Sequence, residues 1–78
     1  MNNIVSLNNL PPGKQCIVRA LGMYGEARRR ISDLGLVCGT VVKAVQKSPS
    51  GDPVAYLIRG AVIALRSEEA ALILVEII

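Results

Sequence analysis

The sequence predicts a mainly β domain with short helices, namely a small SH3-like β-barrel of about five strands. Three observations indicate this class. The chain has only 78 residues, which favours one domain spanning residues 1–78. Short β-branched segments alternate with clusters of Gly, Pro, Ser and Asp, as strands alternate with turns. Helical periodicity is confined to one helix after the first strand and a short helical turn before the last strand. Closure of so few short strands into an SH3-like or OB-like barrel hides the strand edges.

The first element along the chain is an uncharged lead-in over residues 1–13, which ends in Leu-Pro-Pro-Gly and therefore in a turn. Residues 14–21, KQCIVRAL, are predicted to form the first strand. Gly22 and Gly25 bracket a loop that enters the next element.

A helix is predicted over residues 25–34. Tyr24, Ala27, Ile31 and Leu34 recur at spacings of three and four, which places them on one helical face. We therefore expect this apolar stripe to pack against the barrel.

The end of that helix is predicted at Gly35, because glycine adopts the left-handed conformation that terminates many helices. Leu36 then lies where it can contact Ile31 across the last turn, as in a Schellman motif. The Leu-Gly-Leu segment is thus a structural signal.

The remaining strands follow in order, separated by clear turn signals. The segment KSPSGDP is predicted to form the turn between the strands at residues 40–46 and 54–59. Arg59-Gly60 is predicted to form the turn of the hairpin that follows. The strands are predicted at residues 40–46, 54–59, 61–66 and 72–78.

A helical turn is expected between the last two strands. Ser67 is the predicted N-cap, and Glu68 and Glu69 follow it, where negative charge suits the positive end of the helix dipole.

Three consecutive arginines lie on the predicted helix. Arg29 points away from the apolar stripe, and Arg28 and Arg30 lie on its two flanks, since each helical residue turns by roughly 100°. Glu26 precedes Arg30 by four positions and Asp33 follows Arg29 by four. Each of these two arginines therefore has an acid available on its own helix, in pairs worth only about 0.3–0.5 kcal/mol.

Arg28 has no acid three or four positions away. One interpretation is that its stem lies on the barrel beside Tyr24 while its guanidinium contacts a partner protein. The other is that it pairs with a distant acid of the same fold, such as Glu76 or Asp52.

Composition favours a soluble protein with spare apolar surface. Hydrophobic residues make up 51% of the chain and the net charge is +3. Apolar runs such as residues 70–75 fall far short of the roughly 20 residues of a membrane span, and no basic segment precedes an apolar one as in a signal peptide. Cys16 and Cys38 lack CxxC spacing, so we expect both to be buried small hydrophobes.

The residues that enzymes and metal sites use most are scarce. The chain has no histidine and only six acidic residues, which are scattered. Its glycines form neither a P-loop nor a GxGxxG motif. We therefore predict no enzyme, no catalytic residue, no metal ligand and no tightly bound cofactor, and interpret the chain as a binding module.

Five segments in order resemble the FeoA family across nearly the whole chain. They are LPPG at residues 10–13, RRRISDLGL at 28–36, GTVV at 39–42, SGDPVAYLIRG at 50–60 and IALRSEEA at 63–70.

The resemblance implies an SH3-like barrel that acts in bacterial ferrous iron uptake. It also implies a partner, the FeoB membrane permease with its cytosolic GTP-binding domain, which the chain would dock on and regulate or scaffold. The expected location is the cytoplasm, or the inner face of the cell membrane through that partner. Fe(II) association would come only through the pathway.

Candidate partner-binding residues surround the predicted helix. They are Arg28, Tyr24, Met23, Arg29 and Leu36. Two alternatives stay open. One is nucleic-acid binding, which two tyrosines and a charge of +3 make a poor match for a site that stacks bases on aromatics. The other is a homo-oligomer in which residues 72–78 pair between copies.

Overall fold

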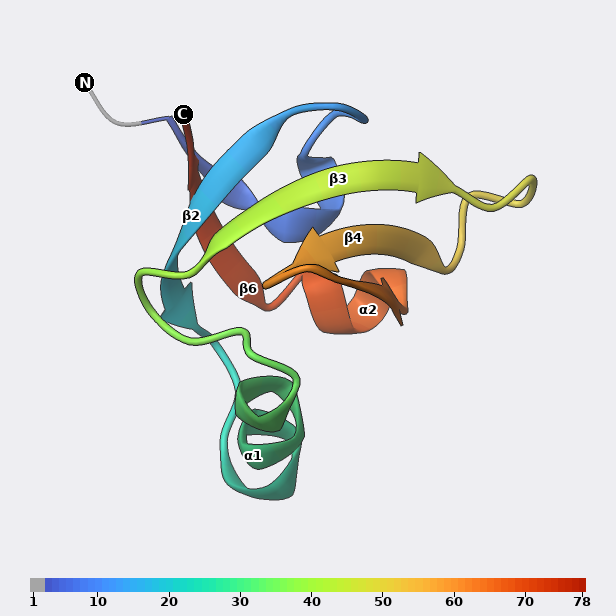
Figure 1. The fold of residues 1–78 in the computed structure, drawn as a ribbon. Helices are drawn as coiled ribbons and strands as arrows, with labels where there is room; N and C mark the ends of the chain where they lie inside the picture. The colour runs from blue at the N-terminus through green and yellow to red at the C-terminus, as the bar shows by residue number, and fades with distance from the viewer. Residues whose placement is uncertain (1–2) are drawn as a thin grey trace.

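A computed structural model describes residues 3–78, and it has the predicted mainly β architecture. Six strands form one antiparallel sheet in the order β1-β6-β2-β3-β4-β5, which bends around one core (Figure 1). The outermost strands β1 and β5 are not paired with each other, so the barrel is partly open. The elements are β1 (Ile4–Ser6), the 3₁₀ helix η1 (Leu7–Asn9), β2 (Gln15–Leu21), α1 (Gly25–Asp33), β3 (Val41–Lys47), β4 (Val54–Ile58), β5 (Ala61–Leu65), α2 (Ser67–Ala70) and β6 (Ile73–Ile77).

The strands alternate between the core and the solvent, as half-buried strands should. In β2, Cys16 and Val18 are fully buried, Ile17 between them is half-buried, and Gln15 and Arg19 on either side are exposed. The same alternation places Tyr56 of β4 at the centre of the core, where its hydroxyl donates to the carbonyl of Leu7 at 3.3 Å.

The N-terminal segment contributes more to the fold than the sequence predicted. The expected lead-in contains both β1 and η1, and Leu7 and Leu10 are buried in the core. The strand β1 pairs with β6, so the barrel has six strands. A single short apolar run without alternation gave no strand signal that could be separated from a loop.

The last strand lies in the interior of the sheet. β6 pairs with β1 on one side and with β2 on the other, and Arg19 of β2 forms an ion pair with Glu76 of β6 at 2.7 Å. The expectation that residues 72–78 would pair between copies is therefore wrong, because both edges of this strand are already occupied.

The predicted helix stop is confirmed. Gly35 has φ +99°, and the amides of Leu36 and Gly35 donate to the carbonyls of Ile31 and Ser32. These two hydrogen bonds are the pair that defines the Schellman motif.

The hairpin of β4 and β5 is also confirmed, with Arg59 and Gly60 both at positive φ in its turn. The helical turn α2 begins one position earlier than expected. Ser67 is its first residue and Arg66 the N-cap, because the Ser67 amide is capped from outside by the Asp52 carboxylate at 2.8 Å. No helix within residues 3–78 has the length and apolar character needed to cross a membrane.

Candidate interaction site

The helix α1 projects from one end of the barrel (Figure 1). Of its nine residues only Ile31 is buried. We define the α1 surface as the exposed side chains of Tyr24, Glu26, Arg29 and Asp33. A shallow depression on this surface is lined by Glu26, Arg29, Arg30, Asp33 and Leu34.

The apolar stripe expected on this helix is only partly correct. Ile31 is buried and Leu34 is half-buried, but Ala27 is exposed and Tyr24 is 87% exposed. Tyr24 is the N-cap residue, with an extended backbone. The helix therefore touches the barrel near its C-terminal end, and its first turn extends into solvent.

The three arginines have different roles from those that the sequence suggested. Arg28, expected to lack a partner, donates from Nη1 to the carbonyl of Leu21 at 3.1 Å. Arg30, expected to pair with Glu26, forms its ion pair with Glu69 of α2 instead. Both side chains therefore fasten the helix to the barrel.

Arg29 is the free member of the triplet. It forms no ion pair or hydrogen bond within residues 3–78, so the expected pairing with Asp33 does not occur. The two acids proposed as distant partners of Arg28 are engaged elsewhere, Glu76 with Arg19 and Asp52 with the Ser67 amide.

The structure separates the five candidate partner-binding residues into three groups. Tyr24 and Arg29 are exposed on the α1 surface, and Arg28 is exposed but bonded to β2. Met23 and Leu36 are 6% and 0% exposed. Both were proposed from the sequence as contact residues, but their side chains belong to the core and are therefore not available to a partner.

The two cysteines also differ. Cys16 is buried, as predicted, and burial raises the pKa of its thiol to about 11. Cys38 was expected to be buried but is exposed, because it lies in the turn before β3 and not at a core-facing position of a strand. Both thiols are free. Residues 3–78 bring no three His, Cys, Asp or Glu side chains together at metal-binding range.

A second exposed region was not among the sequence candidates. Lys43, Leu57 and Val62 lie opposite one another on β3, β4 and β5, and all three are exposed on the outer face of the sheet. The alternation within residues 40–46 could have identified Lys43. The pairing of the three strands, which brings the residues together, has no local signature.

Comparison with known proteins gives a family match over almost the whole chain. The family model described as the FeoA domain matches residues 5–77. A curated relative, the Fe(2+) transport protein A/Fe(2+) transporter FeoB fusion protein of Porphyromonas gingivalis, is 39% identical over 72 residues. The match covers 92% of this chain but 8% of the fusion protein, so the chain spans less than a tenth of that relative.

Solved structures agree with the observed fold. The FeoA protein from Chlorobium tepidum superposes with a TM-score of 0.89 at 34% identity, covering 95% of this chain and 70% of that one. FeoA of Stenotrophomonas maltophilia, complexed with zinc and described as a prokaryotic SH3 domain protein, gives a TM-score of 0.75 at 29% identity, covering 96% and 88%. The predicted SH3-like fold is confirmed.

Proposed function

This chain belongs to the FeoA family, and from that membership we propose that it is a small accessory protein of bacterial ferrous iron uptake. In this proposal it docks on the cytosolic region of a FeoB-type permease and acts without catalysing a reaction itself. The observation that carries the proposal is the relative in which a matching segment and FeoB form one polypeptide.

Covalent fusion supports a functional contact, because tethering holds two domains at a high effective concentration. A separate chain must instead find the permease through its own surface. The location that follows is cytoplasmic, peripheral to the membrane through the partner.

The α1 surface is the part of this chain that we propose for docking. Tyr24 offers an aromatic ring that is 87% exposed, and Arg29 offers a guanidinium without an internal partner. Tyrosine and arginine are enriched among interface residues that contribute most binding energy. Arg28 and Arg30 hold the helix in place, so the surface is presented in a fixed orientation.

The experiment measures affinity between the purified chain and the permease's GTP-binding domain. Arg29→Glu should weaken binding about tenfold, the scale of an interface hot spot, with an unchanged melting temperature. Lys14→Glu makes the same charge change at another exposed position and should bind like the wild type. Equal affinity of both variants and the wild type would reject the α1 surface, and no binding by any of them would reject the partnership.

Arg28→Glu should affect stability as well as binding. The change removes the bond to the Leu21 carbonyl and places a carboxylate near that oxygen. It should lower both affinity and melting temperature, whereas Arg29→Glu should lower affinity alone.

Regulation and scaffolding are separable once binding is established. Saturating chain should change the rate of GTP hydrolysis by the permease if the role is regulatory. An unchanged hydrolysis rate together with a more stable permease complex would favour scaffolding.

For metal, we propose that the isolated domain has no tight Fe(II) or Zn(II) site. The support is the absence of histidine and the scattered acids of the sequence, since such sites are built from clustered His, Cys and carboxylate ligands. Anaerobic titration calorimetry should show no stoichiometric site of sub-micromolar affinity, and finding one would overturn the proposal.

A further inference from the structure

We propose that the open edge of β5 is a strand-pairing site for an extended segment of another protein, apolar in its middle and acidic at its ends. This surface is distinct from the α1 surface. The proposal does not depend on which protein contacts that helix.

The first observation is the geometry of the edge. β5 pairs with β4 on one side only. In the hairpin with a two-residue turn, Ile58 and Ala61 form the first hydrogen-bonded pair, and hydrogen bonds to β4 then alternate along the strand. The amides and carbonyls of Val62 and Ala64 therefore point to the open side, and both residues are exposed.

The second observation is that this edge lacks the usual protection. Soluble proteins blunt sheet edges with charged residues, proline, bulges or short strands. β5 reads AVIAL, without a charge or a proline, and its pairing with β4 is regular along all five residues. The other edge strand, β1, has only three residues. A regular, apolar, unpaired edge is the feature that strand-adding partners recognise.

The third observation is charge. Arg59 lies two residues before β5, Arg66 directly follows β5, and both are exposed. Neither forms a side-chain ion pair within the described part of the chain. Strands β3, β4 and β5 contain no acidic residue, and Asp52 of the preceding turn already caps the Ser67 amide. Acidic residues at the ends of an incoming segment would meet these two arginines.

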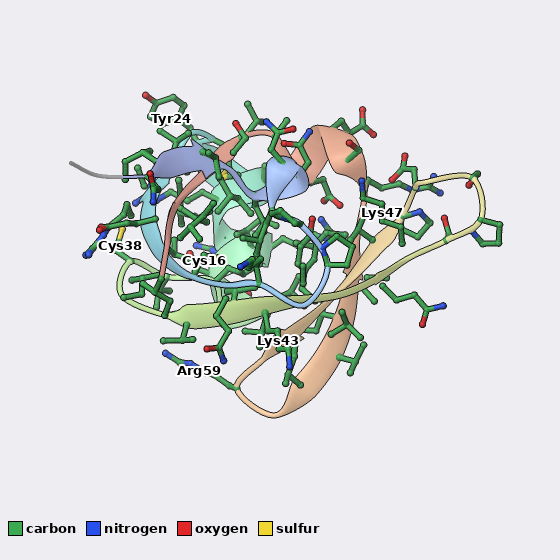
Figure 2. The ribbon with its side chains drawn as sticks, turned by 90° about the horizontal axis from the view of Figure 1, so that it is seen from above. Cys16, Tyr24, Cys38, Lys43, Lys47 and Arg59 are labelled. Atoms are coloured by element: carbon green, nitrogen blue, oxygen red, sulfur yellow. The ribbon has the colours of Figure 1, made fainter. Side chains whose placement is uncertain are left out.

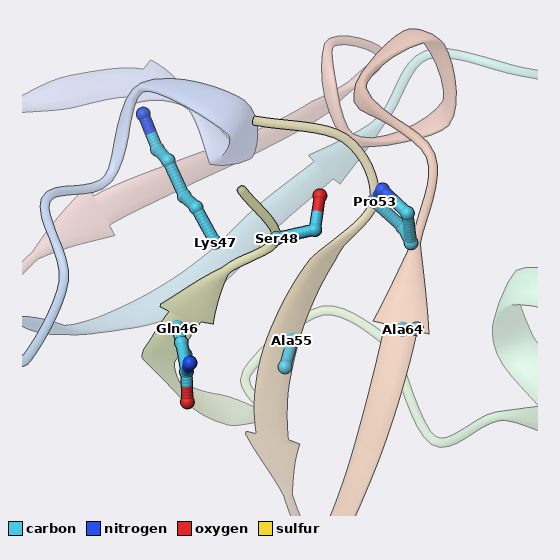
Figure 3. A pocket seen from close by; sticks show the side chains of 6 residues that line it. All are labelled: Gln46, Lys47, Ser48, Pro53, Ala55 and Ala64. Atoms are coloured by element: carbon cyan, nitrogen blue, oxygen red, sulfur yellow. The ribbon is translucent and has the colours of Figure 1, made fainter. Parts of the chain in front are cut away.

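The outer face beside the edge offers space for side chains. Gln46, Ala55 and Ala64 lie opposite one another on neighbouring strands, and they line a shallow pocket with Pro53 and others of the adjacent turn (Figure 3). The small alanine side chains leave room for an apolar group from a strand added next to β5.

The neighbouring row adds positive charge to this face. Lys43 lies opposite Leu57 on β4, and Leu57 opposite Val62 on β5. Figure 2 shows Lys43 on the same side of the molecule as Arg59 in the β4–β5 turn. The face is therefore apolar at its centre and basic at its margins.

Charge also decides against a second copy as the occupant. Two β5 strands paired antiparallel would bring Arg59 of one copy close to Arg66 of the other at both ends. Like charges placed opposite each other destabilise strand pairing. An acidic segment forms favourable contacts at the same two positions.

The test uses a capped synthetic peptide, Glu-Glu-Val-Thr-Val-Thr-Glu-Glu, and a matched peptide with lysine in place of each glutamate. Titration into the isotope-labelled chain should shift the amide signals of Val62 and Ala64 and slow their hydrogen exchange. The lysine peptide should bind at least tenfold more weakly. Equal binding of the two peptides, or shifts that avoid β5, would overturn the proposal.

Two variants test the edge itself. Ala64→Pro removes an amide that faces the open side, where an edge strand tolerates proline, and it should abolish binding. Val62→Lys adds a charge to the exposed edge strand and should weaken binding at least tenfold, which keeps the test decisive if the proline variant fails to fold.

Charge controls complete the design. Arg66→Glu should weaken acidic-peptide binding at least fivefold, whereas Arg29→Glu, the same change on α1, should leave it unaltered. Equal losses in both would indicate attraction to net charge only and would reject the site. Self-association of the chain through β5, seen by sedimentation and removed by Val62→Lys, would assign the edge to a second copy and overturn the proposed occupant.

Discussion

The barrel and the helix α1 are held by different kinds of interaction. Strands alternate buried and exposed residues around a core that includes Tyr56, Val18 and Ile73, each at most 1% exposed. The helix buries one of its nine residues and is fastened by the Schellman motif and by two arginines. Stability therefore comes mainly from the barrel, and most of the helix surface can change without unfolding the protein.

The largest effect should come from emptying the centre of the barrel. Tyr56→Ala removes a ring that is 1% exposed and its hydrogen bond to Leu7, and it should lower the free energy of unfolding by about 3–5 kcal/mol. Urea denaturation measures this loss. Leu57→Ala, the exposed neighbour, should cost less than about 1 kcal/mol. Similar losses for both would mean that the core is not centred on Tyr56.

A smaller effect is expected where the helix joins the barrel. Gly35→Val forces a β-branched residue to φ +99° and places its Cβ 3.3 Å from Ile58 Cγ2. The cost should be on the order of 1–2 kcal/mol, visible as a lower melting temperature. Ala27→Val on the exposed part of α1 should cost under about 0.7 kcal/mol. An unchanged melting curve for Gly35→Val would contradict the helix stop.

Alkaline pH should lower the free energy of unfolding, because two buried groups of the barrel core titrate there. Burial raises the pKa of Cys16 to about 11 and of Tyr56 to about 12, above their ordinary values of 9.0 and 10.0. The folded state holds these protons more tightly than the unfolded state, so stability is intact below pH 9 and falls as pH rises from 9 to 12.

Urea midpoints at pH 8, 10 and 11 would record this decline. Cys16→Ala removes one of the two titrating groups, so its own stability should fall less steeply between pH 9 and 11. A wild-type midpoint that stays constant over this range would contradict the prediction.

The smallest effect should come from the ion pair between the helix and α2. Arg30 and Glu69 pair at the surface, where such pairs contribute roughly 0.2–1 kcal/mol. A double-mutant cycle with Arg30→Ala and Glu69→Ala measures the coupling. A coupling well above about 1 kcal/mol would contradict this prediction and would mean that the pair contributes more to anchoring the helix than a surface ion pair does.

The sequence predicted elements that have local signals. Alternation located β2 and β3, turn residues located the β4–β5 hairpin, and Gly35 located the end of α1. The strand β1 was missed because three residues are too few to show a period, and its position depends on pairing with β6, about seventy positions away in the sequence.

The candidate site was harder to predict, since side-chain partners come from distant segments. The sequence showed acids near Arg29 and Arg30 and none near Arg28. In the structure, Arg28 donates a hydrogen bond to a backbone carbonyl, and Arg30 forms an ion pair with an acid of α2. The spacing of charges along a helix identifies possible partners on that helix only. Met23 and Leu36 were misplaced because the apolar residues around a helix end can equally close the core.

The interior position of β6 sets an order for the formation of the sheet. The strands β3, β4 and β5 are connected by short turns and can pair as soon as they are synthesised, because local contacts form fastest. The strands β1 and β2 cannot be joined until β6, the last of the six to leave the ribosome, inserts between them. We therefore expect β1 and β2 each to keep an unpaired edge until β6 is made, so that the pairing of β6 with both strands is a late step in forming the sheet.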